Sequence, residues 1–276
     1  KLIILFMSEL KNKFLDLKDL AVKWDKYFSI YENYFKKFKN SEIIFVEIGI
    51  FNGGSLRMWK DYFGKNAKII GIDINPECKK FEKTNENIFV EIGNQSDQKF
   101  WNNFFNKYGN VDVVLDDGGH TNLDQIITTT NVIKNINDGG HLIVEDTHTS
   151  YVKEYNSSKK YSFISFAKTI IDDINSNIDL DLNIKKKFSL NKYIYSVEFY
   201  ESMVCFNVDR SKALKNKKIV NKGKSHSIED LTWVGNDILI AKFQRFLKGI
   251  PFIRLNKFTK FLKKRLNDKI LKKYFE

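Results

Sequence analysis

The stretch IIFVEIGIFNGG (residues 43–54) joins a short run of apolar residues to a glycine-rich turn. A short, continuous apolar run is typical of a strand that is buried on both faces of a parallel sheet. The next segment, SLRMWKDYF (55–63), has apolar residues at helical spacing. The order of strand, glycine loop and helix predicts the first unit of a doubly wound α/β fold.

The same alternation continues along the chain. Each further strand is a short apolar run, and a segment of helical spacing separates it from the next strand. We expect strands at 67–74, 87–93, 111–119 and 141–147, and helices at 76–84, 97–109 and 123–136. Five strands with four helices between them predict a Rossmann-like, mostly parallel sheet with helices on both faces.

After residue 150 the pattern changes. A helix is expected at 161–174, and two strands at 192–200 and 202–209 are expected to extend the sheet as an antiparallel edge. We therefore divide the chain into an N-terminal helical segment (1–40), an α/β domain (41–210) and a basic, helical C-terminal extension (211–276).

The composition is that of a folded protein. The chain has 276 residues, of which 42% are hydrophobic and 14% aromatic, which is enough to bury a large core and excludes global disorder. Cys78 and Cys205 form no C-x-x-C pair, and this usage suits a reducing, cytoplasmic compartment. The opening KLIILF is too short for a signal peptide or a membrane span, and we expect the true start at Met7.

The net charge of +12 is concentrated at the C-terminal end. Residues 1–210 contain 28 Lys and Arg against 29 Asp and Glu, whereas residues 211–276 contain 18 against 5. Residues 241–276 place apolar side chains at intervals of three and four, which predicts an amphipathic helix. Such a helix suits peripheral contact with an anionic membrane, here the inner face of the cell membrane. The alternative is that its apolar stripe packs on the main domain or on a partner subunit.

The glycine loop identifies a candidate nucleotide site. Gly49 and Gly53 permit a tight turn and a close approach of the backbone to a ligand, and Ser55 is expected to cap the next helix. Phe51 occupies the place of the second glycine of G-x-G-x-x-G, so the pattern disfavours a dinucleotide. Asp73 ends the second strand, where a carboxylate can accept both ribose hydroxyls.

This combination is typical of class I methyltransferases that bind S-adenosylmethionine; a glycine turn in an unrelated α/β protein is the alternative. Glu47, at the end of the first strand, and Asp116, at the end of the fourth, complete the predicted cofactor-binding residues. After the third strand, Gln95 and Asp97 are expected beside the adenine. The alternative for Asp97 is a helix N-cap in a simple polar turn.

A second group of polar residues follows the fourth and fifth strands. The fourth strand ends in Asp116 and Asp117 and the fifth in Glu145 and Asp146, and both strand ends face one cleft. Side chains alternate along a strand, so one acid from each pair is expected to meet the other beside His120. Two carboxylates suit Mg²⁺, and His120 suits a general base near neutral pH. His148 and Tyr151 are expected to touch the substrate. The alternative is a solvated acid cluster in which His120 caps a turn.

Taken together, five stretches resemble the macrocin and mycinamicin sugar O-methyltransferase family over roughly residues 17–210. They are FVEIGIFNGGSLRMWKDYF, IIGIDINPECK, LDDGGHTNLDQIITT, GGHLIVEDTHTSY and SVEFYESMVCF. The resemblance implies Mg²⁺-dependent methylation of a sugar-containing acceptor, and assembly as a homo-oligomer. By position it implies Asp117 and Asp146 as metal ligands and His120 as the base. Glu47, Gly49 and Asp73 would bind the cofactor.

The sequence also departs from that family. Asn94 stands where the family has an acid after the third strand, and the N-terminal stretch DLAVKWDKYFSIYENYF (19–35) is shortened. Three rival functions remain open at this point. They are a nicotinamide-dependent oxidoreductase, which Phe51 disfavours, an RNA methyltransferase, and an inactive basic membrane-associated protein. Nucleic-acid binding is disfavoured because the chain shows no aromatic stacking platform and no RNA-binding module.

Overall fold

The structure is a computed structural model that describes residues 8–155, 159–177 and 189–224, together with 226, 265, 268 and 271–274. The chain divides into two compact units, Lys1–Lys218 and Ile219–Glu276. In the second unit the described residues include one 3-10 helix, η8 (Lys272–Tyr274). The sheet and the candidate site described below belong to the first unit.

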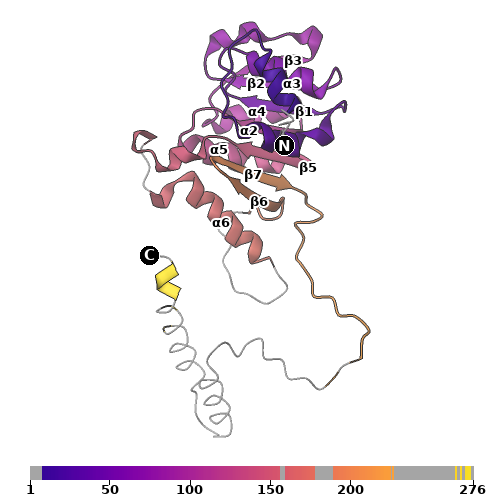
Figure 1. The fold of residues 1–276 in the computed structure, drawn as a ribbon, viewed down its shortest axis with the longest axis vertical. Coiled ribbons are helices and arrows are strands. Elements are labelled where there is room, and N and C mark those ends of the chain that lie inside the picture. Colours follow the sequence, from indigo (N-terminus) through magenta and orange to yellow (C-terminus); the bar gives the residue numbers. More distant parts are fainter. Residues whose placement is uncertain are drawn as a thin grey trace, which may run out of the picture. The chain divides into compact units, whose positions relative to one another are not determined.

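The first unit is built on a seven-stranded sheet of the order β3-β2-β1-β4-β5-β7-β6. Its strands are β1 (Ile44–Ile48), β2 (Lys68–Asp73), β3 (Ile88–Ile92), β4 (Val111–Asp116), β5 (Ile136–Val144), β6 (Ile194–Tyr200) and β7 (Met203–Val208). β1 to β5 run parallel, whereas β7 pairs antiparallel with both β5 and β6 (Figure 1). The predicted doubly wound sheet with an antiparallel edge is confirmed.

Helices cover both faces of this sheet. The core on one face joins α1 (Glu9–Leu15), α2 (Tyr27–Phe35) and α3 (Gly54–Phe63) to strand residues such as Phe45, Val113 and Ile143. The core on the other face joins α4 (Gln98–Tyr108), α5 (Asn122–Val132) and α6 (Phe163–Asn175) to Val46, Val114 and Leu142. Neighbouring residues of a strand thus enter opposite cores, as the pleat of a strand requires.

Several elements differ in extent from the sequence prediction, and the segment predicted as a helix at 76–84 forms the 3-10 helix η2 (Pro76–Phe81). α5 ends at Val132 and β5 already begins at Ile136, five residues before the predicted strand. Ile136 pairs with Val111 ahead of an irregularity in the β4–β5 register, and Gly139 adopts a φ of +84°. A glycine of this conformation lets the strand continue through a distortion that breaks the apolar pattern.

The basic extension is only partly described. Residues 211–224, predicted to be helical with the rest of the tail, instead form turns and irregular chain. This stretch contains Asn216, Asn221 and Gly223 and has no apolar stripe, so it lacks both helix propensity and a face to bury. The amphipathic helix predicted at 241–276 lies largely outside the described residues. Among the residues that are described, no helix has the length and apolar character needed to cross a membrane.

The strand order fixes where a ligand can bind. It reverses between β1 and β4, whose helical connections leave in opposite directions to cover opposite faces. In open α/β sheets the crevice at this switch point, beyond the carboxyl ends of the strands, is the usual ligand site. The loops after β1, β2, β4 and β5 therefore surround the candidate site.

His141 of β5 provides a test of the core beneath the site. Its imidazole is 7% exposed, and Nδ1 lies 2.8 Å from Asn207 Oδ1. Burial lowers the pKa of His141 to about 4; the charge of Lys37 adds to the shift, and the Asn207 contact and Glu198 oppose it. The unfolded chain therefore binds the extra proton between about pH 6.5 and pH 4, and stability is lost as the pH falls through this window.

We expect His141→Phe to remove this part of the pH dependence, which amounts to about 2–3 kcal/mol between pH 7 and pH 4. Urea unfolding at a series of pH values measures it, with the exposed His226→Phe as the control. Parallel pH profiles for wild type and His141→Phe would show that His141 is not buried in its neutral form.

Candidate active site

A cavity of about 520 Å³ opens at the carboxyl ends of the central strands. This volume is within the range of small-molecule and cofactor sites. Among the residues predicted for the site, the cavity is lined by Gly49, Ser55, Asp73, Gln95, Asp117, His120 and Asp146. The switch point of the sheet therefore carries a real cavity, and seven of the predicted side chains or backbone positions reach it.

The glycine loop forms one wall of the cavity. Gly49 has a φ of +82°, and a Cβ built on it would lie 2.1 Å from the Asp117 carbonyl oxygen. Only glycine fits here, because the β1 and β4 loops touch at this point. Gly53 also has a positive φ, but it packs against the Phe81 ring rather than lining the cavity.

Asp73 ties the glycine loop to the end of β2. Its Oδ2 accepts hydrogen bonds from the backbone N–H groups of Ile50 and Phe51, at 3.0 and 3.2 Å, and its Oδ1 accepts one from Asn75 at 2.9 Å. A carboxylate offers about four acceptor positions, so capacity for a ligand hydroxyl remains. Asp73 thus holds the loop in shape and also lines the cavity.

The predicted helix cap at Ser55 is wrong. The N-cap of α3 is Gly53, and Ser55 lies inside the first turn, where its hydroxyl donates to Glu47 Oε2 at 2.6 Å. Glu47 is fully buried and points to the α2–α3 side of the sheet, away from the cavity lining. The helix begins one residue before Ser55, so Ser55 stands too late to cap it. Its hydroxyl instead serves the buried carboxylate, which needs hydrogen-bond donors.

The loop after β3 forms the opposite wall. Gln95 donates from Nε2 to Asp116 Oδ1 and to Thr128 Oγ1, both at 3.0 Å, and its Oε1 accepts from Gly119 N–H at 2.8 Å. Asp116 itself is buried beneath α5 and does not line the cavity; burial raises its pKa to about 7, against the Gln95 hydrogen bond.

The other polar residues of this wall divide between structural and cavity positions. Asp97 accepts from Lys99 N–H as the N-cap of α4 and lies outside the cavity lining, which matches the alternative drawn from the sequence. Asn94 lines the cavity, and so does Asp124 of α5, a carboxylate that the sequence analysis did not select. Asp124 accepts hydrogen bonds from Ser96 and Thr121, so it reaches this wall from a helix rather than from a strand end.

The acids after β4 and β5 meet at His120. His120 Nε2 lies 3.7 Å from both Asp117 Oδ1 and Asp146 Oδ2, and one potential ligand atom from each of the three residues falls within 4.8 Å of the others. This donor set of two carboxylates and an imidazole fits a divalent cation. His120 Nδ1 is buried without a hydrogen-bond partner among the described residues.

The N-terminal segment supplies donors to Asp146 that the sequence analysis missed. Trp24 Nε1 and the Tyr27 hydroxyl both donate to Asp146 Oδ1, at 2.9 and 2.8 Å. Both donors precede the sheet in sequence, so a search at strand ends cannot find them. The pair holds Oδ1 and leaves Oδ2 facing His120.

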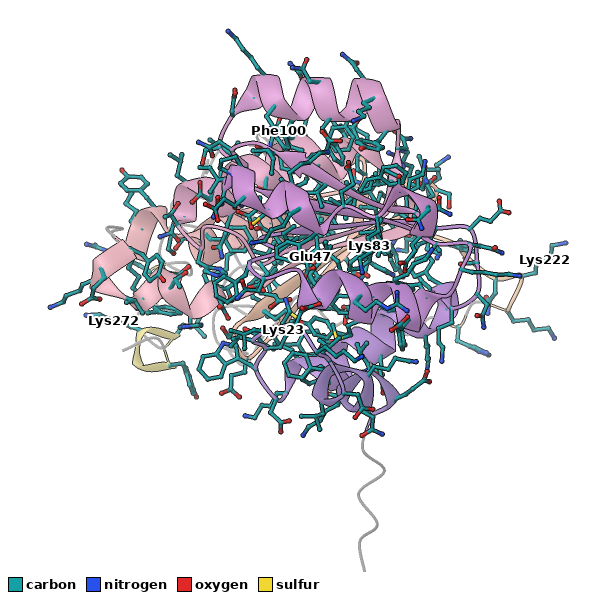
Figure 2. All side chains as sticks on the ribbon, turned by 90° about the horizontal axis from the view of Figure 1, so that it is seen from above. Lys23, Glu47, Lys83, Phe100, Lys222 and Lys272 are labelled. Carbon is teal, nitrogen blue, oxygen red and sulfur yellow. The ribbon has the colours of Figure 1, made fainter. Side chains whose placement is uncertain are left out.

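A second acid cluster lies next to these residues and was also missed. Glu145 is 1% exposed and accepts a short hydrogen bond from the Tyr31 hydroxyl. The Lys23 ammonium contacts Asp117, Glu145 and Glu47. In Figure 2, Lys23 and Glu47 lie close together in the centre of the view. Burial and the charge of Asp117 raise the pKa of Glu145, and burial raises the pKa of Glu47 against the opposing charge of Lys23.

The two predicted substrate residues lie outside the cavity. His148 is exposed, contacts Ser202 Oγ through Nδ1 at 2.5 Å and packs edge-on against Trp24. Tyr151 is 63% exposed. Neither residue lines the cavity, so their proposed contact with an acceptor stays a prediction.

The backbone of the cavity is strained at three residues that are not glycine. Phe51, His120 and Asp146 have φ values of +45°, +54° and +53°. Such left-handed conformations cost about 1–3 kcal/mol each for residues with a side chain and gather at functional sites. The conformations of His120 and Asp146 set the direction of the imidazole and of one candidate metal ligand.

The sequence is similar to those of sugar O-methyltransferases. It is 28% identical over 172 residues to 8-demethyl-8-alpha-L-rhamnosyl tetracenomycin-C 2'-O-methyltransferase of Streptomyces olivaceus, covering 58% of this chain and 44% of that protein. It is 30% identical over 152 residues to demethylmacrocin O-methyltransferase of Streptomyces fradiae, covering 52% of this chain and 37% of the relative. The predicted resemblance is confirmed, although the matches span less than half of these relatives. No family model matches the chain.

Solved structures agree on the fold. The MycE methyltransferase of the mycinamycin biosynthetic pathway, in complex with Mg and SAH, superposes with a TM-score of 0.66 at 22% identity, covering 88% of this chain and 60% of that chain. A second structure of that protein also contains mycinamycin VI and gives a TM-score of 0.65. The Rossmann-like fold of a methyltransferase is therefore confirmed.

Two glycines with positive φ allow a matched test of the loop contact. Gly49→Ala meets the Asp117 carbonyl, whereas Gly109→Ala, at the C-cap of α4, meets nothing within 4 Å. Each change places a side chain on a residue with a positive φ, at a cost of about 1–3 kcal/mol. Gly49→Ala should cost a further ~1–3 kcal/mol through the clash, measured as the free energy of unfolding in urea. Equal losses for the two variants would mean that the β1 and β4 loops do not touch.

Proposed function

We propose that the protein is an S-adenosylmethionine-dependent O-methyltransferase that uses Mg²⁺ and acts on a sugar hydroxyl of a glycan, glycolipid or glycosylated small molecule. The observation that carries the proposal is a cavity lined by both Asp73 and the group Asp117, His120 and Asp146. A nucleoside site and a divalent-cation site share one space. Similarity to named sugar O-methyltransferases supports the choice of acceptor.

The cofactor would lie along the glycine loop. Asp73 offers its carboxylate to the ribose hydroxyls. Because Gly49 has no Cβ, the glycine loop can pack directly against Asp117 and Gly118 after β4 and form the floor of the cavity there. Gln95, fixed by Asp116, Thr128 and Gly119, shapes the adenine wall. When bound, S-adenosylmethionine supplies the methyl group.

The metal would be held by Asp117 and Asp146. When bound, the cation lowers the pKa of a coordinated hydroxyl. His120 Nε2 faces both carboxylates and is placed to accept the proton of the acceptor hydroxyl. Trp24 and Tyr27 fix Asp146, so the acceptor meets carboxylates and imidazole that are already positioned.

The cofactor assignment predicts the effect of Asp73→Ala. Loss of a charge-assisted hydrogen bond should weaken S-adenosylhomocysteine binding by about 1.5–3 kcal/mol, which is roughly 10- to 150-fold in Kd. Isothermal titration calorimetry measures this change, and Glu77→Ala, an exposed acid outside the cavity lining, is the matched control. An unchanged affinity in Asp73→Ala would remove the basis for the cofactor assignment.

The roles of His120 and the two acids predict different losses. His120→Ala should lower turnover by about 10²–10⁴-fold and leave Mn²⁺ binding intact, because the imidazole serves as a base. Asp117→Asn and Asp146→Asn should weaken Mn²⁺ binding itself. The measurements are transfer of labelled methyl groups to a panel of glycosides with free 2- and 3-hydroxyls, and Mn²⁺ titration followed by electron paramagnetic resonance.

Chelator completes this test. Wild-type turnover should disappear in excess EDTA and return with Mg²⁺, since the hydroxyl would no longer be acidified. Full turnover in excess EDTA would overturn the role given to the metal. Loss of Mn²⁺ binding in His120→Ala would make His120 a ligand rather than the base.

A further inference from the structure

Asp124 is the acid of the cavity lining that the proposed function leaves without a role. Among the described residues, the lining contains four carboxylates. Asp73 is assigned to the ribose, and Asp117 and Asp146 are assigned to the metal. Asp124 comes instead from α5 and belongs to the wall that the loop after β3 forms. Because a carboxylate only accepts hydrogen bonds, its place in the cavity points to a donor on the ligand.

The wall around Asp124 adjoins the position of the ribose. The Gly93 N–H donates to the Asp73 carbonyl oxygen at 2.9 Å, so the loops that follow β2 and β3 lie side by side. Ser96 of the β3 loop donates its hydroxyl to Asp124 Oδ1 and thereby joins this loop to α5. A nucleoside whose ribose contacts Asp73 can therefore place its base against this wall, where Ile74 adds apolar surface to the lining.

The other polar side chains of this wall are used within the protein. Gln95 donates both of its Nε2 protons to protein oxygens, and its Oε1 accepts from the Gly119 N–H. Asn94 Oδ1 accepts from the Ser96 N–H at 2.8 Å, which closes a turn in the loop. The negatively charged acceptor that this wall offers to a ligand is therefore Asp124.

Asp124 is held in place and still has capacity for a ligand. Its Oδ1 accepts from the Ser96 hydroxyl, and its Oδ2 accepts from the Thr121 hydroxyl at 2.6 Å. A carboxylate offers about four acceptor positions, so these two contacts do not saturate it. The Asp124 N–H donates to Thr121 Oγ1 at 3.1 Å, which makes Thr121 the N-cap of α5. The cap explains the contacts with Thr121, but it does not explain why the carboxylate lines the cavity.

The ligand group that suits such an acceptor is the exocyclic amino group of a base. Adenine carries a 6-amino group, which donates hydrogen bonds, whereas hypoxanthine carries a carbonyl oxygen at the same position. A carboxylate accepts from the amino group but repels the lone pairs of the carbonyl oxygen. A site built to bind an N–H group disfavours the analogue that lacks it, because its own polar group is then left unpaired.

We propose that Asp124 selects adenine as the base of the bound nucleoside by accepting a hydrogen bond from its 6-amino group. The position of the nucleoside, with its ribose at Asp73, rests on the proposed function. Asp124 is a specificity-determining residue, since it contacts the base and no reacting atom. Gln95, which the sequence predicted beside the adenine, holds the loops of this wall together while Asp124 makes the contact that discriminates.

The test compares S-adenosylhomocysteine with S-inosylhomocysteine, in which a carbonyl oxygen replaces the 6-amino group, by isothermal titration calorimetry on the full-length protein. Wild type should bind S-adenosylhomocysteine about 10- to 150-fold more tightly, the effect of one charge-assisted hydrogen bond. The amide of Asp124→Asn can donate to the carbonyl oxygen as well as accept from the amino group, so the ratio of the two Kd values should fall to near one. Asp124→Ala offers neither contact and should also lower the ratio.

The ratio separates selectivity from stability, and a matched variant controls for the loss of charge. Both Kd values are measured on the same variant, so a smaller folded fraction affects the two ligands alike. Asp97→Asn makes the same exchange in the same loop, but Asp97 is the N-cap of α4 and lies outside the cavity lining. Asparagine serves equally well as an N-cap, so this variant should keep the wild-type ratio.

Each outcome decides the proposal. Equal affinity of wild type for the two ligands overturns it and leaves the cofactor assignment standing. A wild-type ratio in Asp124→Asn, which keeps the size of the side chain, also overturns it, as does an equal fall in Asp97→Asn. If neither ligand binds wild type, the cofactor assignment fails, and adenosine is compared with inosine by saturation-transfer NMR. A preference for adenosine that Asp124→Asn abolishes then supports the role of Asp124, and the absence of any preference overturns it.

Discussion

The structure depends on the burial of negative charge at the carboxyl ends of the central strands. Glu47, Asp117 and Glu145 lie on one face of the sheet, and two of them are almost completely shielded from water. Carboxylates in such a place need donors and cations, and the rest of the site supplies them. Ser55 and Tyr31 supply hydrogen-bond donors to these carboxylates, and the Lys23 ammonium supplies a positive charge.

This requirement makes the N-terminal segment part of the site. Leu10, Tyr31 and Phe35 belong to the core on the α1–α3 face, so the segment is anchored by packing. The same segment reaches the acids through Lys23, Trp24 and Tyr27. Changes in the core packing of α2 should therefore be felt at Asp117 and Asp146, although no residue of α2 lines the cavity.

Much of the fold could be predicted because the chain is locally consistent. Apolar runs marked the parallel strands, and Gly49 and Asp73 marked the switch point. The acids at the ends of the fourth and fifth strands marked the second group beside His120, although the choice of Asp117 and Asp146 rested on the family resemblance. The alternation of side chains also correctly implied that neighbouring acids diverge: Asp116 enters the α5 face and Asp117 the opposite one. Ser55 was assigned to the wrong partner because local cap preference says nothing about the buried carboxylate of Glu47 on the preceding strand.

The site residues that the sequence analysis did not select are those whose role depends on tertiary contacts. Lys23, Trp24 and Tyr31 resemble ordinary surface or core residues in sequence, and only the folded chain brings them to the acids. Glu145 stands beside Asp146, and strand-end position alone does not decide which of two adjacent acids faces the cavity; the β4–β5 register does.

The proposed enzyme combines a nucleoside site and a divalent-cation site in one cavity, and a crystal structure of the protein grown with S-adenosylhomocysteine and Mn²⁺ tests this claim most directly. The expected result is one anomalous Mn²⁺ peak next to Asp117 and Asp146, with the ribose hydroxyls of the ligand on Asp73. A cavity occupied by the nucleoside with no Mn²⁺ peak near these acids, or a nucleoside bound away from Asp73, would contradict it.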